Sequence, residues 1–288
     1  MYSKAKHMDM TQVLELAEAE GWGVAFYYYT KAQIEQGKTV LEDERMADWR
    51  YLLPAQTGNT VLTLGAGWGT IPVALAENAT AVHVVDRSPE TIAFLRIRQR
   101  QQNIHQLHLI LADSWSHLNF ERDAFDLIAV REFDWNGGHP MPFGEMLRRL
   151  YPLLKPAGTI QVTVGNRLAF QQLLRLERKH PSSPLHTLPG YRRILRTAQF
   201  TDIQVYAPLP HHQGIPMFYV PLDDTQAMQF FFSHLFPLFE RVSAEARQAY
   251  RLQYAIARTM VRFALMTRLT RLARYFVPGF CIFARKAI

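Results

Sequence analysis

A short apolar strand that runs into closely spaced glycines is the feature that most constrains the fold of this chain. The stretch Thr60–Asp86 reads TVLTLGAGWGTIPVALAENATAVHVVD. It contains an apolar run, a glycine turn, a segment of helical character, and a β-branched run that ends in an acid. This succession predicts one βαβ unit with short connections. The glycines occupy alternate positions, Gly65, Gly67 and Gly69.

The turn has the properties of a ligand site. Glycine allows positive φ and lets a ligand approach backbone N–H groups, and the following helix starts there with its own free N–H groups. Asp86 lies 21 residues beyond Gly65, which is close to the spacing of an acid that binds ribose hydroxyls. The alternative is a tight strand-to-helix turn without a ligand.

The glycine spacing separates two classes of cofactor. The pattern is G-x-G-x-G, whereas the dinucleotide fingerprint is G-x-G-x-x-G. With its preceding strand, the turn resembles that of the class I (Rossmann-like) S-adenosylmethionine-dependent methyltransferases. The segment LLKPAGTIQV, which starts at Leu153, is similar to the LLkPGG turn of the same family. The core motifs also resemble those of bacterial methyltransferases associated with glycan assembly.

This resemblance implies the fold and the cofactor contacts. The fold would be a Rossmann-like, seven-stranded, mostly parallel α/β sheet with helices on both faces. Asp86 would bind the ribose and Asp113 the adenine amino group, although Asp113 could instead cap the next turn. The family usually has an acid two residues before the first glycine, and Thr63 stands there, which leaves open whether cofactor binding is weakened. The predicted cofactor-binding residues are Gly65, Ala66, Gly67, Gly69, Asp86, Arg87, Asp113, Ser114, Trp115 and Arg131.

Polar loops beyond the strands are the expected acceptor site. In an open parallel sheet the ligand crevice lies at the carboxyl ends of the strands. Methyl transfer requires the acceptor to be held in line and water to be excluded, and a base would assist a hydroxyl acceptor. Loop scaffolding is the alternative role for these residues. The predicted catalytic residues are Glu132, His139 and His211, and the predicted substrate contacts are Tyr28, Asp134, Asn166 and His212.

The chain is expected to have three parts. Residues 1–50 would form an N-terminal helical cap, residues 51–207 with 277–288 the cofactor-binding core, and residues 208–276 a mainly helical insertion or lid that forms part of the substrate site. In the cap, a helix is expected over Thr11–Glu20 with Thr11 as its N-cap, and Tyr27 to Tyr29 are expected on a strand or loop. Arg98, on the helix that follows Asp86, is expected to be solvated.

Composition narrows the cellular setting. The single cysteine, Cys281, excludes an internal disulfide framework and suits a reducing compartment. No apolar signal segment and no run of about 18 apolar residues is apparent, which predicts a cytoplasmic protein. Adjacent His211 and His212 diverge and have no carboxylate at ligand spacing, so no metal site is predicted.

Positive charge is concentrated near the C-terminus. From Arg241 onward ten Lys and Arg accompany one acid, a net charge of +9, whereas the first 240 residues sum to −2. Nucleic acid, an anionic membrane surface or an anionic substrate could each use such a region, and a solvated helix face explains it equally well. The loop after the fourth strand lacks an N-P-P-Y type motif, which disfavours nucleic acid as substrate.

The sequence therefore predicts a methyltransferase that transfers a methyl group from S-adenosylmethionine to a hydroxyl or amine of a small or glycan-type acceptor. An NAD(P)-dependent oxidoreductase and a catalytically degenerate, methyltransferase-like binding module are the alternatives. The acceptor and the oligomeric state are not encoded in these motifs.

Overall fold

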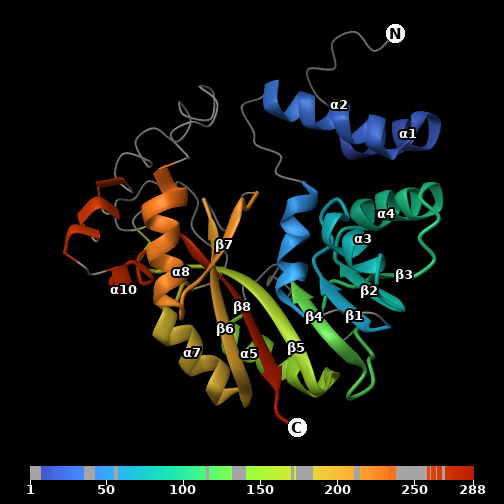
Figure 1. Cartoon of the computed structure of the whole chain (residues 1–288). Coiled ribbons are helices and arrows are strands. Elements are labelled where there is room, and N and C mark those ends of the chain that lie inside the picture. The colour runs from blue at the N-terminus through green and yellow to red at the C-terminus, as the bar shows by residue number, and fades with distance from the viewer. Residues whose placement is uncertain are drawn as a thin grey trace. The chain divides into compact units, whose positions relative to one another are not determined.

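The strands of the chain form one mixed sheet in a computed structural model (Figure 1). Their order is β3-β2-β1-β4-β5-β8-β6-β7. The α/β architecture is confirmed, but the predicted count of seven strands is wrong because the sheet has eight. The structure describes residues 8–35, 43–54, 58–114, 117–131, 141–169, 172, 184–210, 215–237, 258–259, 261–263, 265–267 and 270–288.

The chain divides into two compact units, residues 1–161 with 286–288 and residues 162–285. The first contains the glycine turn. The second contains β6, β7 and all of β8 except its last residue, Lys286. The predicted cap, core and insertion boundaries remain predictions.

In the first unit the strands β1 to β4 are parallel. Strand β1 pairs with β2 and β4, and β2 pairs with β3. Leu64 is in register with both Val85 and Val130, so three strands end at one edge of the sheet. The elements are α1 (Met10–Glu20), α2 (Trp22–Glu35), η1 (Glu44–Leu52), β1 (Thr60–Leu64), α3 (Thr70–Ala76), β2 (Ala81–Asp86), α4 (Pro89–Gln101), β3 (Leu107–Leu111), β4 (Phe125–Val130), α5 (Phe143–Leu150), η3 (Tyr151–Leu153) and β5 (Leu154–Gly165), whose last residues belong to the second unit.

Two helices precede the sheet and pack against α4, as Figure 1 shows. Helix α1 is capped by Asp9, not by Thr11, because the Asp9 carboxylate accepts the Gln12 N–H while the Gln12 side chain accepts the Asp9 N–H. This reciprocal pair is a capping box. The expectation of a strand or loop at the tyrosines is wrong. They lie within α2, which starts directly after Gly21 (φ 106°) ends α1.

The second unit begins within β5 and ends within β8. Strands β6 and β7 are antiparallel, and β7 is the strand that the expectation of a mainly helical insertion missed. The final strand lies where the sequence predicts it. The elements are α7 (Leu188–Thr197), β6 (Phe200–Leu209), β7 (Phe218–Pro221), α8 (Thr225–Phe230), the π-helical turn η4 (Phe231–Leu235), α10 (Thr270–Ala273) and β8 (Gly279–Lys286). None of the helices in the described part of the chain combines the length and the hydropathy needed to cross a membrane.

Candidate functional site

The glycine turn leaves two backbone donors available. Gly65, Gly67 and Gly69 have φ values of 83°, 54° and 89°, which only glycine adopts without strain. The Gly65 N–H donates to Val85 O at 2.9 Å and the Gly69 N–H to Ala66 O at 3.0 Å. Within the described residues the N–H groups of Gly67 and Trp68 have no protein acceptor. The turn can therefore donate two hydrogen bonds to a ligand.

Asp86 connects the turn to the end of β2. Its side chain is only 5% exposed. The Ala66 N–H donates to Oδ2 at 2.8 Å, and the Ser88 N–H donates to Oδ1 at 2.9 Å. Each carboxylate oxygen retains a second lone pair, which is what two vicinal ribose hydroxyls require. Asp86 can therefore hold the glycine turn in shape and accept from a nucleoside.

Arg131 lies directly over the glycine turn. Its backbone N–H donates to Leu64 O at 2.9 Å, which fixes the residue at the end of β4. A Cβ built on Gly67 would lie 2.1 Å from Arg131 Nη1, so the guanidinium occupies the space that a side chain would fill. A guanidinium next to two backbone donors is complementary to a carboxylate. The amino-acid end of S-adenosylmethionine has such a group.

Thr63 replaces the acid that the resembling family usually has. It is 1% exposed, and its hydroxyl donates to His83 O at 3.5 Å, a long hydrogen bond within the sheet. A threonine hydroxyl carries no charge, so this position gives an ammonium group no ion pair. The positively charged end of a bound amino acid would have to rely on other acceptors.

The residues after β2 and β3 form the second half of the predicted cofactor site. The Ala112 N–H donates to Asp86 O at 3.0 Å, so the segment after β3 begins beside Asp86. Asp113 is exposed, and its Oδ1 lies 2.8 Å from His117 Nδ1. Ser114 is half-buried and Arg87 is exposed. Trp115 lies outside the described residues.

An aromatic cluster lies beside the turn and was not predicted from the sequence. Trp68, inside the glycine motif, packs against Phe26 and Tyr29 of α2 and Phe94 of α4, with ring centroids 5.2, 4.8 and 4.9 Å away. The N-terminal helices therefore contact the glycine turn through Trp68. The one signal in the sequence for this contact was the run of three tyrosines, Tyr27 to Tyr29. Of these three, Tyr29 packs against Trp68. Tyr28, the predicted substrate residue, is 38% exposed on α2.

The expectation that Arg98 is solvated is wrong. The side chain is 5% exposed, and Nη1 donates to Trp68 O at 2.8 Å. Its guanidinium also lies 4.1 Å from the ring centroid of Trp22, a cation–π contact. Arg98 lies four residues after Phe94, on the buried face of α4, and this helical spacing is the signal that could have revealed its role.

The predicted acceptor site is only partly described. Glu132, Asp134, His139, His211 and His212 lie outside the described residues, so their roles stay predictions. Within the described chain, no three His, Cys, Asp or Glu side chains are placed to hold a metal ion.

Asn166 has a structural task. It is 1% exposed, and its Nδ2 donates to Tyr275 O and Val277 O, both at 2.8 Å, while Oδ1 accepts the Leu168 N–H at 3.1 Å. Both amide hydrogens are therefore used within the second unit. These contacts hold the backbone after β5, and the role of Asn166 as a substrate contact stays a prediction.

Parallel strands, a glycine turn and an acid at the end of the next strand define a Rossmann-like, nucleoside-binding domain. Residues 61–158 match a family described as "Methyltransferase domain". The resemblance noted in the sequence is thereby confirmed: this part of the chain is a methyltransferase domain of the S-adenosylmethionine-dependent class, and S-adenosylmethionine is the cofactor of that class. The finer resemblance to glycan-assembly enzymes remains a prediction.

Solved structures share the fold at low sequence identity. Haemonchus contortus phosphoethanolamine N-methyltransferase 2, in complex with S-adenosyl-L-methionine, matches with a TM-score of 0.54 and 17% identity over 96% of this chain and 60% of that chain. The putative methyltransferase in complex with the Haloferax volcanii Trm112 methyltransferase activator matches with a TM-score of 0.53 and 16% identity over 96% and 98%. The chain thus spans about three fifths of the Haemonchus enzyme. No curated protein sequence matches it.

Proposed function

We propose that this chain transfers a methyl group from S-adenosylmethionine to a hydroxyl or amine of a small or glycan-type acceptor. The buried carboxylate of Asp86 is the observation that supports this proposal most directly. It lies beside a glycine turn with two available N–H donors, an arrangement that suits a nucleoside carrying an amino-acid chain.

The residues divide the cofactor between them. Asp86 accepts from the ribose hydroxyls, and Asp113 and Ser114 lie at the adenine end. The N–H groups of Gly67 and Trp68 and the guanidinium of Arg131 bind the carboxylate of the methionine part. Thr63 provides no charge to balance the ammonium group. Arg131 and the turn therefore contribute a larger share of the affinity for the amino-acid end than they would if an acid stood at position 63.

The chemistry requires positioning more than an additional reactive group. When bound, S-adenosylmethionine supplies a methyl carbon that its sulfonium already activates. The protein has to hold the acceptor in line with the breaking carbon–sulfur bond and exclude water. The acceptor forms the new bond with its lone pair and gives up its proton, for which Glu132, His139 and His211 are the proposed bases.

Binding of the product cofactor tests this proposal. Asp86→Asn replaces an acceptor oxygen with an NH₂ group that faces a backbone N–H donor. We expect the affinity for S-adenosylhomocysteine, measured by isothermal titration calorimetry, to fall at least about tenfold, which corresponds to about 1.4 kcal/mol. Arg131→Met should weaken binding as well. Asp202→Asn, an exposed site in the second unit, is the matched control and should bind as the wild type does.

The same titration separates the alternatives. Wild-type protein that binds NAD(P) in place of S-adenosylhomocysteine would be an oxidoreductase, and protein that binds neither would be a binding module. Folding of each variant is checked by circular dichroism. A folded Asp86→Asn variant with unchanged affinity would refute the assigned role of Asp86.

A further inference from the structure

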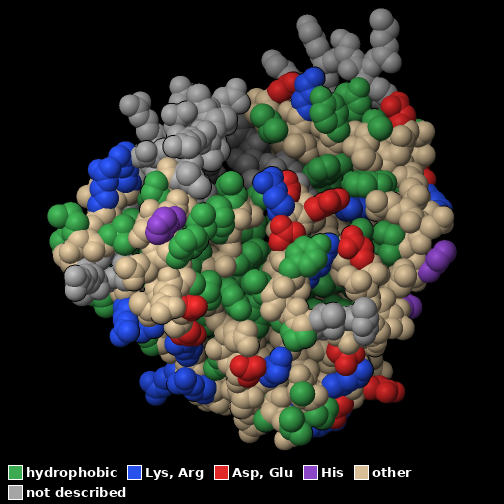
Figure 2. All heavy atoms as spheres, viewed as in Figure 1, with side chains coloured by type: hydrophobic (Ala, Val, Ile, Leu, Met, Phe, Trp, Pro, Cys, Tyr) green, Lys and Arg blue, Asp and Glu red, His purple; other side chains and the backbone are tan. Residues whose placement is uncertain are grey.

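Basic residues dominate the second unit. Residues 162–285 contain sixteen Lys and Arg against six Asp and Glu, a net charge of +10, whereas the remainder of the chain sums to −3. Figure 2 shows several of these basic side chains gathered over α7, at the lower left of the view. The second unit therefore carries a positive net charge, whereas the first unit, which contains the nucleoside site, carries a negative one.

A groove with a volume of about 530 Å³ runs along α7. We call it the α7 groove. Arg192 and Arg196 are one helical turn apart, and Arg193 is adjacent to the first of them, so one helix contributes three guanidinium groups. None of the described residues that line the groove is an acid. These residues are Leu188, Pro189, Arg192, Arg193, Arg196, Thr197 and Tyr275.

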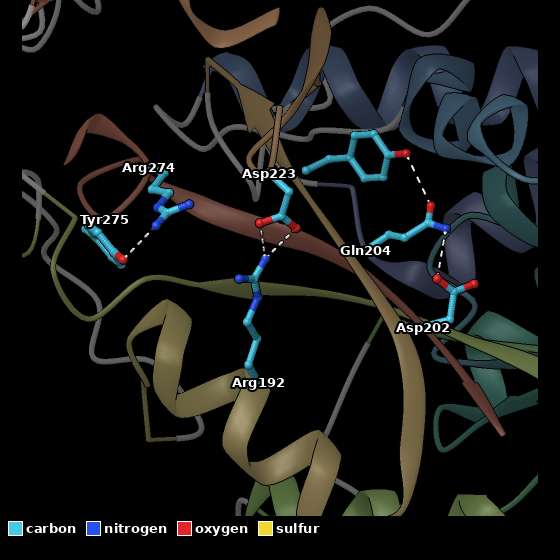
Figure 3. Close-up of polar contacts among 7 residues, drawn as sticks. Arg192, Asp202, Gln204, Asp223, Arg274 and Tyr275 are labelled. Atoms are coloured by element: carbon cyan, nitrogen blue, oxygen red, sulfur yellow. Dashed lines mark hydrogen bonds and ion pairs between the residues drawn. The ribbon is translucent and has the colours of Figure 1, made fainter. Parts of the chain in front are cut away.

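The arginines retain donors for a ligand. Arg192 Nη2 donates to Asp223 Oδ1 at 2.6 Å and to Oδ2 at 2.5 Å (Figure 3). Its Nε is buried and has no hydrogen-bond partner among the described residues. Arg193 and Arg196 are exposed. The Asp223 contact thus holds Arg192 in place through one nitrogen only.

Tyr275 adds a neutral donor to the groove. Its hydroxyl accepts from Arg274 Nη2 at 3.0 Å, as Figure 3 shows, so its own proton remains to be donated. Asn166 holds the same residue through a 2.8 Å hydrogen bond to its backbone carbonyl. The phenol therefore occupies a fixed position with a positively charged group behind it.

A solvated helix face is the simpler explanation, and it accounts for only part of the arrangement. A cation at the end of a helix is favoured by the helix dipole, which suits Arg196. Like charges one turn apart, however, destabilise a helix. An adjoining hollow on α7 contains Asp202 and Asp223 beside Arg192 and Arg196. In the α7 groove Arg192 is paired with Asp223, whereas Arg193 and Arg196 form no ion pair with the described residues.

We propose that the α7 groove binds the phosphate group of an anionic ligand. Guanidinium groups match the oxygens of a phosphate through paired N–H donors, and the Tyr275 hydroxyl provides a neutral donor. The ligand's phosphate pairs with Arg193 and Arg196, which are exposed. All of its described residues belong to the second unit, whereas the glycine turn and Asp86 belong to the first.

Binding of inorganic phosphate to the full chain tests the site. Thermal shift is measured against phosphate concentration at constant ionic strength, held with potassium chloride. We expect saturable stabilisation of the wild type and at least tenfold weaker binding by the double variant Arg193→Gln, Arg196→Gln. Arg148→Glu, on an exposed position of α5 in the first unit, changes the net charge by the same amount and should leave phosphate binding unchanged.

A second measurement identifies the source of the phosphate. Sedimentation with vesicles of phosphatidic acid in phosphatidylcholine, compared with phosphatidylcholine alone, detects a lipid headgroup. Vesicle binding that the double variant loses supports the groove with a lipid as ligand, and binding of inorganic phosphate alone supports it with a free phosphorylated molecule. The proposal is overturned if the wild type binds neither probe, or if the double variant binds as the wild type does. Titration with S-adenosylhomocysteine in parallel shows whether the nucleoside site is intact.

Discussion

Gly69 shows how a single missing side chain shapes the nucleoside site. Its φ of +89° is a conformation that residues with a Cβ rarely adopt. A Cβ there would also lie 2.2 Å from Leu95 Cδ2 on α4. The position thus requires glycine for two reasons, the backbone conformation and the close approach of α4.

We expect Gly69→Ala to lower the free energy of unfolding by about 1–3 kcal/mol, because strain and overpacking add. The affinity for S-adenosylhomocysteine should fall too, since the turn must shift. Urea unfolding measures the first effect and calorimetry the second. Gly23→Ala is the control: no atom lies within 4 Å of its added Cβ, and the helix α2 should gain about 0.5–1 kcal/mol. Equal stability changes in the two variants would contradict this account.

At the scale of elements, a histidine pair links β2 and β3. His83 and His108 are in register, and their rings stack with centroids 4.8 Å apart. Phe120 and Phe125 meet the His83 ring edge-on at 5.9 and 5.4 Å. Burial, and secondarily the charge of His108, lower the pKa of His83. Folding therefore favours the neutral imidazole.

This pKa shift predicts acid sensitivity. A histidine whose pKa is lower in the folded state contributes its full stability above its unfolded pKa of about 6.5. That contribution to stability is lost as the pH falls from the unfolded-state pKa through the lower folded-state pKa. We expect the free energy of unfolding, measured in urea between pH 7.5 and 5, to fall less steeply for His83→Gln than for the wild type. His105→Gln, at an exposed position, should leave the slope unchanged, and an identical slope in all three proteins would refute the assignment.

At the scale of the whole molecule, the two units differ in charge. The second unit carries +10 and the first −3. Like charges within one compact unit repel, and added salt screens that repulsion. The surplus therefore opposes folding of the second unit most at low ionic strength.

Thermal unfolding should register this surplus. We expect the Tm to rise by a few degrees, equivalent to about 1 kcal/mol, between about 20 and 300 mM sodium chloride. The double variant Arg262→Gln, Arg271→Gln, at exposed positions of the second unit, should show a smaller rise. Arg148→Glu in the first unit should not reduce it. A Tm that is independent of salt, or an equal reduction by both variants, would argue against self-repulsion in the second unit.

Three features could be predicted from local sequence patterns: the parallel half of the sheet, the glycine turn with Asp86 at the end of the next strand, and the final strand at Gly279–Lys286. These features arise from local periodicity and from residues with special backbone requirements, so they are visible in short windows of the chain. The same windows predicted the methyltransferase class that the family match confirmed.

Features that depend on contacts between distant segments became visible only in the folded chain. Strand β7 exists because Phe218–Pro221 pairs with β6, Arg98 is buried because Trp22 and Trp68 surround it, and Arg131 lies over a glycine more than sixty residues earlier. The α7 groove depends in the same way on Tyr275 from beyond α10. Such contacts form only once the chain is folded. They could not be predicted from the sequence, because neither partner carries a local pattern that identifies the other.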